Sequence, residues 1–230
     1  MRTLVALILI GAASVSERVE VPLADARGSV VAINQGVPEG FVPLFDGKSL
    51  DGWKVYASKK NVWVAENGMI VCQGDGGGWL GTTKDYANFE LRLEYKIKPG
   101  GNSGVYIRAP ETGQISRAGM EIQILDDLDP QYAKIDFYQY TGSIYHVVPP
   151  SRRAAKPPGQ WNAMTIRADG RHVVVILNDK KIVDADLDYY LKDPAIAKEH
   201  PGLTRTTGRI GLQSHTDRVE FRNLWVKELK

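Results

Sequence analysis

Three short runs of alternating apolar and polar residues carry the side chains that are best suited to chemistry. They are NSGVYIR at 102–108, MEIQILD at 120–126 and RIGLQSH at 209–215. Because successive side chains of a strand point to opposite faces, each run predicts one core face and one polar face. The polar faces together carry Tyr106, Arg108, Glu121, Gln123, Gln213 and His215. Any one of these side chains is typical of a solvated strand, but amide, phenol, guanidinium and imidazole groups together favour a concave platform that grips sugar hydroxyls.

His215 is the strongest candidate for proton transfer, because imidazole ordinarily titrates near neutral pH. His172 and His200 fall at a predicted hairpin edge and in a loop, where a solvated surface position is expected. In the run SIYHVV, Tyr145 and His146 alternate, so only one of them can face the platform, and strand parity favours Tyr145.

The spacing of Glu121, Gln123 and Asp126 resembles the Glu-x-Asp-x-x-Glu strand of retaining laminarinase-type glucanases, but it departs at two of the three positions. Retaining hydrolysis needs two carboxyl groups about 5 to 5.5 Å apart. Simple alternation puts Asp126 on the face opposite Glu121. We therefore do not expect hydrolysis by paired carboxylates.

Other common catalytic motifs are missing from the sequence or fail in their context. Gly76, Gly78 and Gly81 form a nominal dinucleotide fingerprint, but 84–96 alternates like a strand where the fingerprint needs a helix. The chain contains no Walker loop, no HExxH and no paired CxxC. The glycines are therefore predicted to form a turn.

The elements that must position the platform are predicted to be short antiparallel strands, which indicates an all-β, concanavalin-like jelly-roll sandwich of two curved sheets. The predicted strands are 69–73, 89–97, 103–108, 120–125, 163–168, 173–177, 209–213 and 219–226. HVVVIL, Asn178-Asp179 and KKIVDAD predict a hairpin, since Asn and Asp tolerate positive φ. Pro194 disfavours one continuous helix over 187–200, so this segment is predicted to be a surface excursion of the chain, that is, a loop with a helical turn. The long segment 126–158, with one strand-like piece at 143–148, is predicted to line a binding site.

Composition places the chain among globular proteins and argues against a nucleic-acid or membrane-surface partner. The 230 residues are 43% hydrophobic and carry a net charge of +2, which is too small for an electrostatic footprint on a polyanion. Residues 1–16 have a charged start, an apolar run and a small-residue end, which predicts a signal peptide and a periplasmic or extracellular location. Residues 17–40 read as a linker or pro-segment, and 41–230 as the jelly-roll domain. Cys72 is the only cysteine, so no internal disulfide can form.

The chain resembles a family of exported bacterial proteins, the 3-keto-disaccharide hydrolase domain. The resemblance runs from about Phe41 to Lys230 and rests on FVPLFDGKSLDGW, GNSGVYIR, MEIQILD, YTGSIYHVVPP, KPPGQWN and GRIGLQSHTDRVEFRNLWVKEL. It implies cleavage of glycosides that carry a ketone at C3, where a single base can remove the acidified C2 hydrogen and the enolate can expel the C1 group. Such a reaction needs a base, an enolate stabiliser and an acid.

Under that resemblance, His215 and Glu121 are assigned as the base and acid in either order, and Arg108 as the enolate stabiliser. Hydroxyl contacts are assigned to Asn102, Tyr106, Gln123, Tyr145 and Gln213. A divalent metal bound by Glu121 and His215 would serve the same electrostatic purpose. The sequence leaves open whether the metal is needed, which aglycon leaves, and the oligomeric state.

Two other functions stay open at this point. A carbohydrate-binding or lectin-like domain would use Trp53, Trp63 and Trp79 as stacking platforms, although core packing is the expected role of these rings. A structural exported domain would instead expose an apolar patch.

Overall fold

The computed structural model describes residues 36–230. The signal peptide predicted at 1–16 and most of the linker predicted at 17–40 lie outside this range. Within it, no helix has the length and apolar character that a membrane span requires.

The described chain consists mainly of β-strands that are joined by turns. The strands are β1 (Val42–Pro43), β2 (Trp53–Tyr56), β3 (Trp63–Glu66), β4 (Met69–Cys72), β5 (Trp79–Tyr86), β6 (Phe89–Ile97), β7 (Asn102–Ala109), β8 (Met120–Leu125), β9 (Asn162–Asp169), β10 (His172–Leu177), β11 (Lys180–Asp186), β12 (Gly208–Gln213) and β13 (Val219–Glu228). Short helices are α1 (Ile115–Ala118), α2 (Leu187–Tyr190), α3 (Pro194–Glu199) and the 3-10 turns η1 (Pro130–Tyr132), η2 (Phe137–Gln139) and η3 (Pro201–Thr204).

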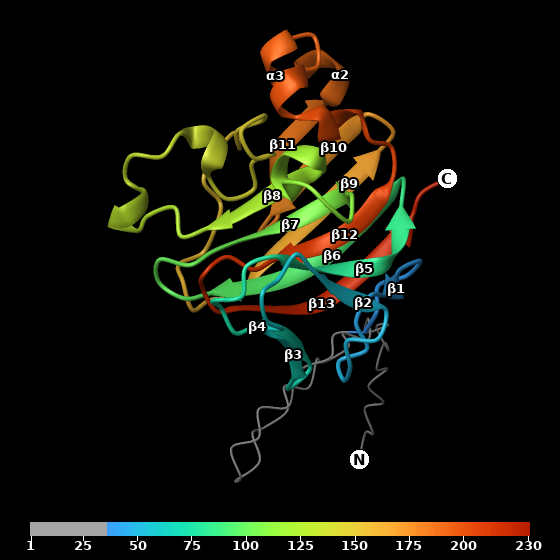
Figure 1. Ribbon diagram of the computed structural model, residues 1–230, viewed down its shortest axis with the longest axis vertical. Coiled ribbons are helices and arrows are strands. Elements are labelled where there is room, and N and C mark those ends of the chain that lie inside the picture. The colour runs from blue at the N-terminus through green and yellow to red at the C-terminus, as the bar shows by residue number, and fades with distance from the viewer. Residues whose placement is uncertain (1–35) are drawn as a thin grey trace, which may run out of the picture. The chain divides into compact units, whose positions relative to one another are not determined.

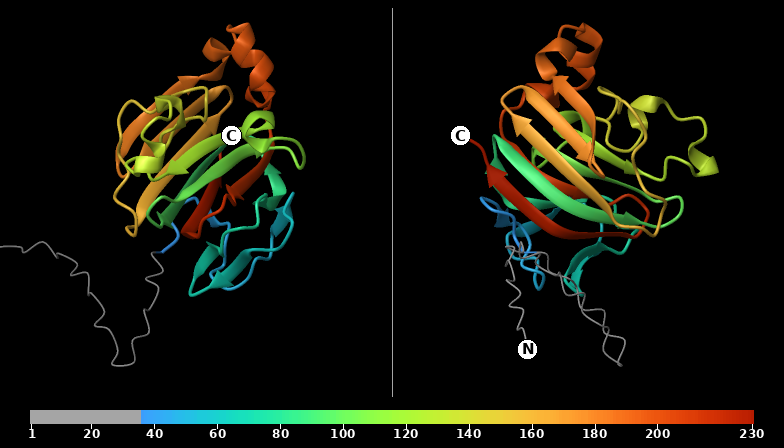
Figure 2. Two further views of the ribbon diagram at one scale, coloured as in Figure 1. Left: turned by 60° about the vertical axis from the view of Figure 1, so that its left-hand side comes forward. Right: turned by 180° about the vertical axis from the view of Figure 1, so that it is seen from behind.

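The strands form two antiparallel sheets that pack face to face (Figure 1). The larger sheet has the order β11-β10-β9-β6-β13-β4-β3, and β1 also pairs with β13. The smaller sheet has the order β2-β5-β12-β7-β8. Seen from behind, β6, β9 and β10 of the larger sheet lie in front (Figure 2). This architecture confirms the predicted all-β sandwich.

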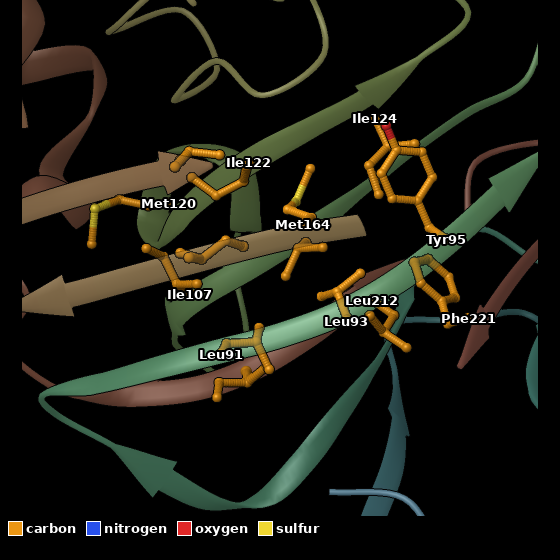
Figure 3. Packing of buried hydrophobic residues seen from close by; sticks show 14 of the residues in the cluster. Leu91, Leu93, Tyr95, Ile107, Met120, Ile122, Ile124, Met164, Leu212 and Phe221 are labelled. Atoms are coloured by element: carbon orange, nitrogen blue, oxygen red, sulfur yellow. The ribbon is translucent and has the colours of Figure 1, made fainter. Parts of the chain in front are cut away.

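Strand alternation explains how the two sheets make one core. In β6 every second side chain is buried, from Phe89 to Ile97. Ile122 and Ile124 of β8 face these side chains from the smaller sheet and are fully buried (Figure 3). Burial of such apolar side chains contributes roughly 1.5 to 3 kcal/mol each.

The predicted hairpin is present, and the predicted glycine turn is present at Gly76 and Gly78, whereas Gly81 lies in β5. Asn178 and Asp179 join β10 to β11 with φ angles of 49° and 63°. Gly77 and Gly78 also have positive φ and lead into β5, which is a strand and not a helix. The predicted strands did not include β2, β3 or β5, and the run 84–96, which was predicted to alternate like one strand, is divided between β5 and β6.

The excursion 187–200 contains two short helices where one helical turn was predicted. Asp186 and Asp193 cap them, since their side chains accept hydrogen bonds from the backbone N–H groups of Asp188 and Ala195. Pro194 is the first residue of α3. Proline is well tolerated there, because the backbone N–H group that it lacks would have no hydrogen-bond partner within the helix. Both helices lie at one end of the sandwich (Figure 1).

Candidate active site

The outer face of the smaller sheet brings together three of the predicted platform strands. On this face Gly211 of β12 pairs with Tyr106 of β7, and Tyr106 pairs with Glu121 of β8. Gly104 of β7 pairs with Gln123. The adjacency of β12, β7 and β8, which the sequence left open, is thus a property of the structure.

Glu121 is the central group of this face. Its side chain is only 2% exposed. It lies across Gly104, because a Cβ atom at Gly104 would be 2.3 Å from Glu121 Oε1. Burial raises the pKa of Glu121 to about 8, and no hydrogen bond from the described residues offsets this. The carboxyl group is therefore mostly neutral at pH 7 and able to exchange a proton near that pH.

Tyr106 and Gln213 form a hydrogen-bonded pair beside Glu121. Gln213 Nε2 donates to the Tyr106 hydroxyl oxygen at 3.0 Å, which leaves the tyrosine proton free for another acceptor. Burial and the nearby Glu121 raise the pKa of Tyr106 well above its ordinary value. Gln213 Oε1 is buried and finds no partner among the described residues. A buried acceptor of this kind is suited to a ligand hydroxyl.

Tyr145 joins the site from within the long segment 126–158. Its backbone N–H donates to the Glu121 carbonyl oxygen at 2.9 Å, so residues 143–145 extend the sheet beyond β8. The Tyr145 hydroxyl accepts a hydrogen bond from Gln139 Nε2 at 3.1 Å. The parity prediction placed Tyr145 at the site. His146 is exposed beside it, with its ring 4.3 Å from that of Tyr145.

Gln123 and Asn102 occupy less central positions. Gln123 is 4% exposed, and its Oε1 atom accepts a hydrogen bond from the backbone N–H of Ile124. Asn102 is half-buried at the start of β7, opposite Leu125, and contacts Tyr132. Of the predicted hydroxyl contacts, Tyr106 and Tyr145 are thus the ones next to Glu121, and Gln213 is joined to it through Tyr106.

The prediction that Arg108 lies on the open face is wrong. Arg108 has a φ of +49°, and the register between β7 and β12 shifts at this point, so a bulge turns its side chain away. Its guanidinium is fully buried and donates to the carbonyl oxygens of Ala87 and Arg205. These contacts hold two loops together and leave no donor aimed at Glu121.

His215 lies two residues beyond Gln213, after the end of β12. Its side chain is exposed, and its Nδ1 atom is 3.2 Å from Thr216 Oγ1. It therefore stands at the margin of the candidate site. Asp126 does not form a carboxylate pair with Glu121, since its Oδ2 atom accepts a hydrogen bond from the Gly100 N–H.

The platform is less open than the sequence predicted, because aromatic residues cover part of it. Trp79 lies over Gly81 and Gly211, where added Cβ atoms would approach its ring to 2.2 and 2.5 Å. Tyr56 stacks on Trp79 with ring centroids 4.4 Å apart, and Tyr106 meets Trp79 edge-on at 5.8 Å. This cluster of Tyr56, Trp79 and Tyr106 is a structural element that sequence reasoning missed. Gly81 in WLG and Gly211 in GRIGL were the signal that could have revealed it, because a glycine within a strand-like run leaves room for a large neighbouring side chain.

The burial of the three tryptophans named from the sequence confirms their expected role in core packing. Trp53, Trp63 and Trp79 are 8%, 2% and 1% exposed, which leaves no open stacking platform on them. Within residues 36–230, no cluster of three or more His, Cys, Asp or Glu side chains is arranged to hold a metal ion. Glu121 and His215, the two metal ligands named from the sequence, are not part of such a cluster, and a metal site stays a prediction.

Comparisons with known proteins identify a family and relatives for this chain. Residues 40–227 match the family described as 3-keto-alpha-glucoside-1,2-lyase-like domain. The chain is 30% identical to a Bacteroides thetaiotaomicron protein named 3-keto-disaccharide hydrolase, over 83% of this chain and 79% of that protein.

Solved structures show the same fold. A Parabacteroides distasonis protein described as a glycosyl hydrolase is 28% identical, with a TM-score of 0.75 over 84% of this chain and 95% of its own. A second from that organism is 32% identical, with a TM-score of 0.71 over 82% and 99%. The carbohydrate-binding module CBM66 from Bacillus subtilis is similar in fold alone, at 13% identity and a TM-score of 0.52 over 77% and 96%.

Proposed function

The chain belongs to the family of 3-keto-alpha-glucoside-1,2-lyase-like domains, and from this premise we propose that it cleaves glycosides whose sugar carries a ketone at C3. Family and relatives support a hydrolase that acts on carbohydrate. The observation that carries the finer proposal is Glu121, a single buried carboxyl group with a pKa of about 8.

The chemistry of a 3-keto sugar requires only one strong proton-transfer group. The ketone acidifies the C2 hydrogen, because the electron pair left on C2 delocalises onto the ketone oxygen. A base takes that proton and an enolate forms. The enolate then restores the ketone and forms a C1–C2 double bond, while the C1–O bond breaks and the leaving oxygen takes a proton. Water added across the double bond makes the net reaction a hydrolysis, and without it the reaction is that of a lyase.

Glu121 is suited to both proton transfers. In its ionised form it accepts the C2 proton, and in its neutral form it returns a proton to the leaving oxygen. A pKa near the working pH keeps both forms accessible. Such proton transfer typically contributes a factor of about 10² to 10⁴ in rate.

Tyr106 takes the role of enolate stabiliser that the sequence assigned to Arg108. Its oxygen is occupied by Gln213 Nε2, so its own proton is available to a developing oxyanion beside Glu121. The unpartnered Gln213 Oε1 is suited to accept a hydrogen bond from a sugar hydroxyl. His215, which is exposed at the margin, remains a second candidate for the acid.

The predicted export to the periplasm or the exterior is part of the proposal, since it rests on the signal-like residues 1–16. Cell fractionation with N-terminal sequencing of the mature protein tests it. Cleavage near residue 16 is expected, and an intact chain in the cytoplasmic fraction would contradict it.

The decisive experiment mixes the purified protein with a nitrophenyl 3-keto-glucoside or with the matched glucoside, with and without a chelator. Nitrophenol release is expected from the keto substrate alone. Glu121→Gln should lower the rate at least about 100-fold, whereas the exposed Glu39→Gln is the matched control and should keep it. Comparison with His215→Ala shows which residue supplies the acid.

Each outcome separates the remaining alternatives. Sugar binding without release from either substrate would identify a binding domain and contradict the enzyme. Undiminished release by Glu121→Gln would contradict its catalytic role. Release that stops with the chelator and returns with added divalent metal would establish a metal requirement.

A further inference from the structure

A cavity separate from the candidate active site lies at another edge of the sandwich. It has a volume of about 160 Å³ and is formed by β6, the end of β8, the loop that follows β8, and the segment 153–158 before β9. Glu121, Tyr106, Gln213 and Tyr145 do not line it. Most of its surface is apolar and comes from Ile97, Leu125, Ala155, Pro157 and Pro158.

The polar end of the cavity contains a hydroxyl group without a partner. Tyr95 lines the cavity, is 1% exposed, and its hydroxyl makes no hydrogen bond within residues 36–230. Figure 3 shows its ring rising from β6 toward Ile124 of the facing sheet. Leaving a buried hydroxyl unpaired is costly, so such a group usually has a bound water or ligand as partner.

Asp127 supplies a second polar group at the same cavity. Its Oδ1 atom accepts hydrogen bonds from the Thr141 N–H and hydroxyl at 2.9 and 3.0 Å, which fixes the carboxylate and leaves Oδ2 available. Asp127 lines the same cavity as Tyr95, and its negative charge contributes to raising the pKa of the Tyr95 hydroxyl. Together they offer one donor and one acceptor, which is the complement of a single hydroxyl group.

Size and charge limit what the cavity can hold. A cavity of roughly 150 Å³ holds a benzene molecule in an apolar protein interior, so 160 Å³ fits one six-membered ring. Asp126 and Asp127 disfavour an anion, while Arg153 and Lys156 at the mouth disfavour a cation. The fitting ligand is neutral.

We propose that this cavity is a second binding site, for a small neutral ring that carries one hydroxyl group, such as a phenol or a cyclic alcohol. The ring packs against Leu125 and the two prolines. Its hydroxyl accepts from Tyr95 and donates to Asp127. The site is independent of the proposed glycoside cleavage, because it shares none of the residues assigned to that reaction.

Phenol and benzene are the probes that test the proposal, each titrated into the ¹⁵N-labelled full chain and followed by amide chemical shifts. Phenol should shift the amides of 125–128 and 153–156 saturably. Tyr95→Phe should weaken the binding of phenol about fivefold, which corresponds to the loss of one hydrogen bond. It should leave the affinity for benzene unchanged. Ala155→Trp fills the mouth from an exposed position and should abolish binding, whereas the exposed Ala195→Trp is the matched control.

Three results would overturn the proposal. They are no saturable shift with phenol, equal phenol affinity in wild type and Tyr95→Phe, and undiminished binding in Ala155→Trp. The first would mean that water alone fills the cavity, and the second would mean that the Tyr95 hydroxyl does not bind the ligand. Dispersed spectra check that each variant is folded, and if Tyr95→Phe does not fold, Ala155→Trp decides the matter.

Discussion

At the scale of single residues, the candidate site depends on how Glu121 is buried. A carboxyl group ordinarily titrates near pH 4.5, and removal from water moves this one to about 8. Gly104 makes the burial sterically feasible, because any side chain there would collide with the carboxylate. The same residue that is suited to proton transfer therefore carries a cost in stability when it ionises.

This cost predicts a pH-dependent effect of Glu121→Gln on the melting temperature. Below about pH 4.5 both the folded and the unfolded chain hold the proton, so Glu121 does not affect the pH dependence. Between that value and about 8, the unfolded chain releases the proton while the folded chain keeps it, so wild-type stability falls as pH rises. Glu121→Gln should therefore gain Tm over wild type from pH 5 to pH 8, and the gain should level off above.

Thermal unfolding at pH 4, 6, 8 and 9 measures the effect. The exposed Glu39→Gln is the control and should follow wild type throughout. A Tm difference between Glu121→Gln and wild type that stays constant over this range would mean that Glu121 is not a buried titrating group.

At the scale of elements, the bulge in β7 decides the role of Arg108. A regular strand would point Arg108 to the same face as Tyr106, as the alternation in NSGVYIR predicts. The extra residue opposite β12 instead directs the guanidinium toward the carbonyl groups of Ala87 and Arg205. Arg108 thus ties the turn before β6 and the loop before β12 to β7.

Arg108→Met should therefore lower the stability of the fold and leave the turnover rate of the folded protein unchanged. Two backbone carbonyl groups lose a charged donor that is itself buried, and the free energy of unfolding should fall by about 2 to 4 kcal/mol. Urea unfolding measures this loss, with the exposed Arg167→Met as a control that should cost about 1 kcal/mol or less. A large drop in turnover per folded molecule, without loss of stability, would restore Arg108 to the active site.

At the scale of the whole molecule, the two sheets hold the site in place by sharing one core. Ile122 precedes Gln123 in β8, faces the larger sheet and is fully buried, as Figure 3 shows. The strand that presents Glu121 on one side is thus fixed by packing on the other. Loss of core volume at this position should affect the entire sandwich.

Ile122→Ala should destabilise the protein by about 2 to 5 kcal/mol, because it removes buried methyl groups and leaves a cavity between the sheets. Leu128→Ala, at a position that is 74% exposed, is the comparison and should change stability by less than about 0.5 kcal/mol. Equal midpoints of urea unfolding for the two variants would contradict the packing shown for β8.

Much of the fold could be predicted from the sequence, because strand alternation and turn residues are local properties of the chain. The limits of β6 and β8, the Asn178-Asp179 hairpin and the turn before β5 all follow from residues close in sequence. The same alternation placed Glu121 and Gln123 on one face. The period of two is set by backbone geometry and needs no distant contact.

The tertiary structure alone decided what those side chains became. The pKa of Glu121, the hydrogen bond between Tyr106 and Gln213, and the redirection of Arg108 all depend on strands that are far apart in sequence. Burial and register arise only when such strands pair and the sheets pack. The sequence by itself thus determined which residues could do chemistry, and only the folded chain determined which of them meet.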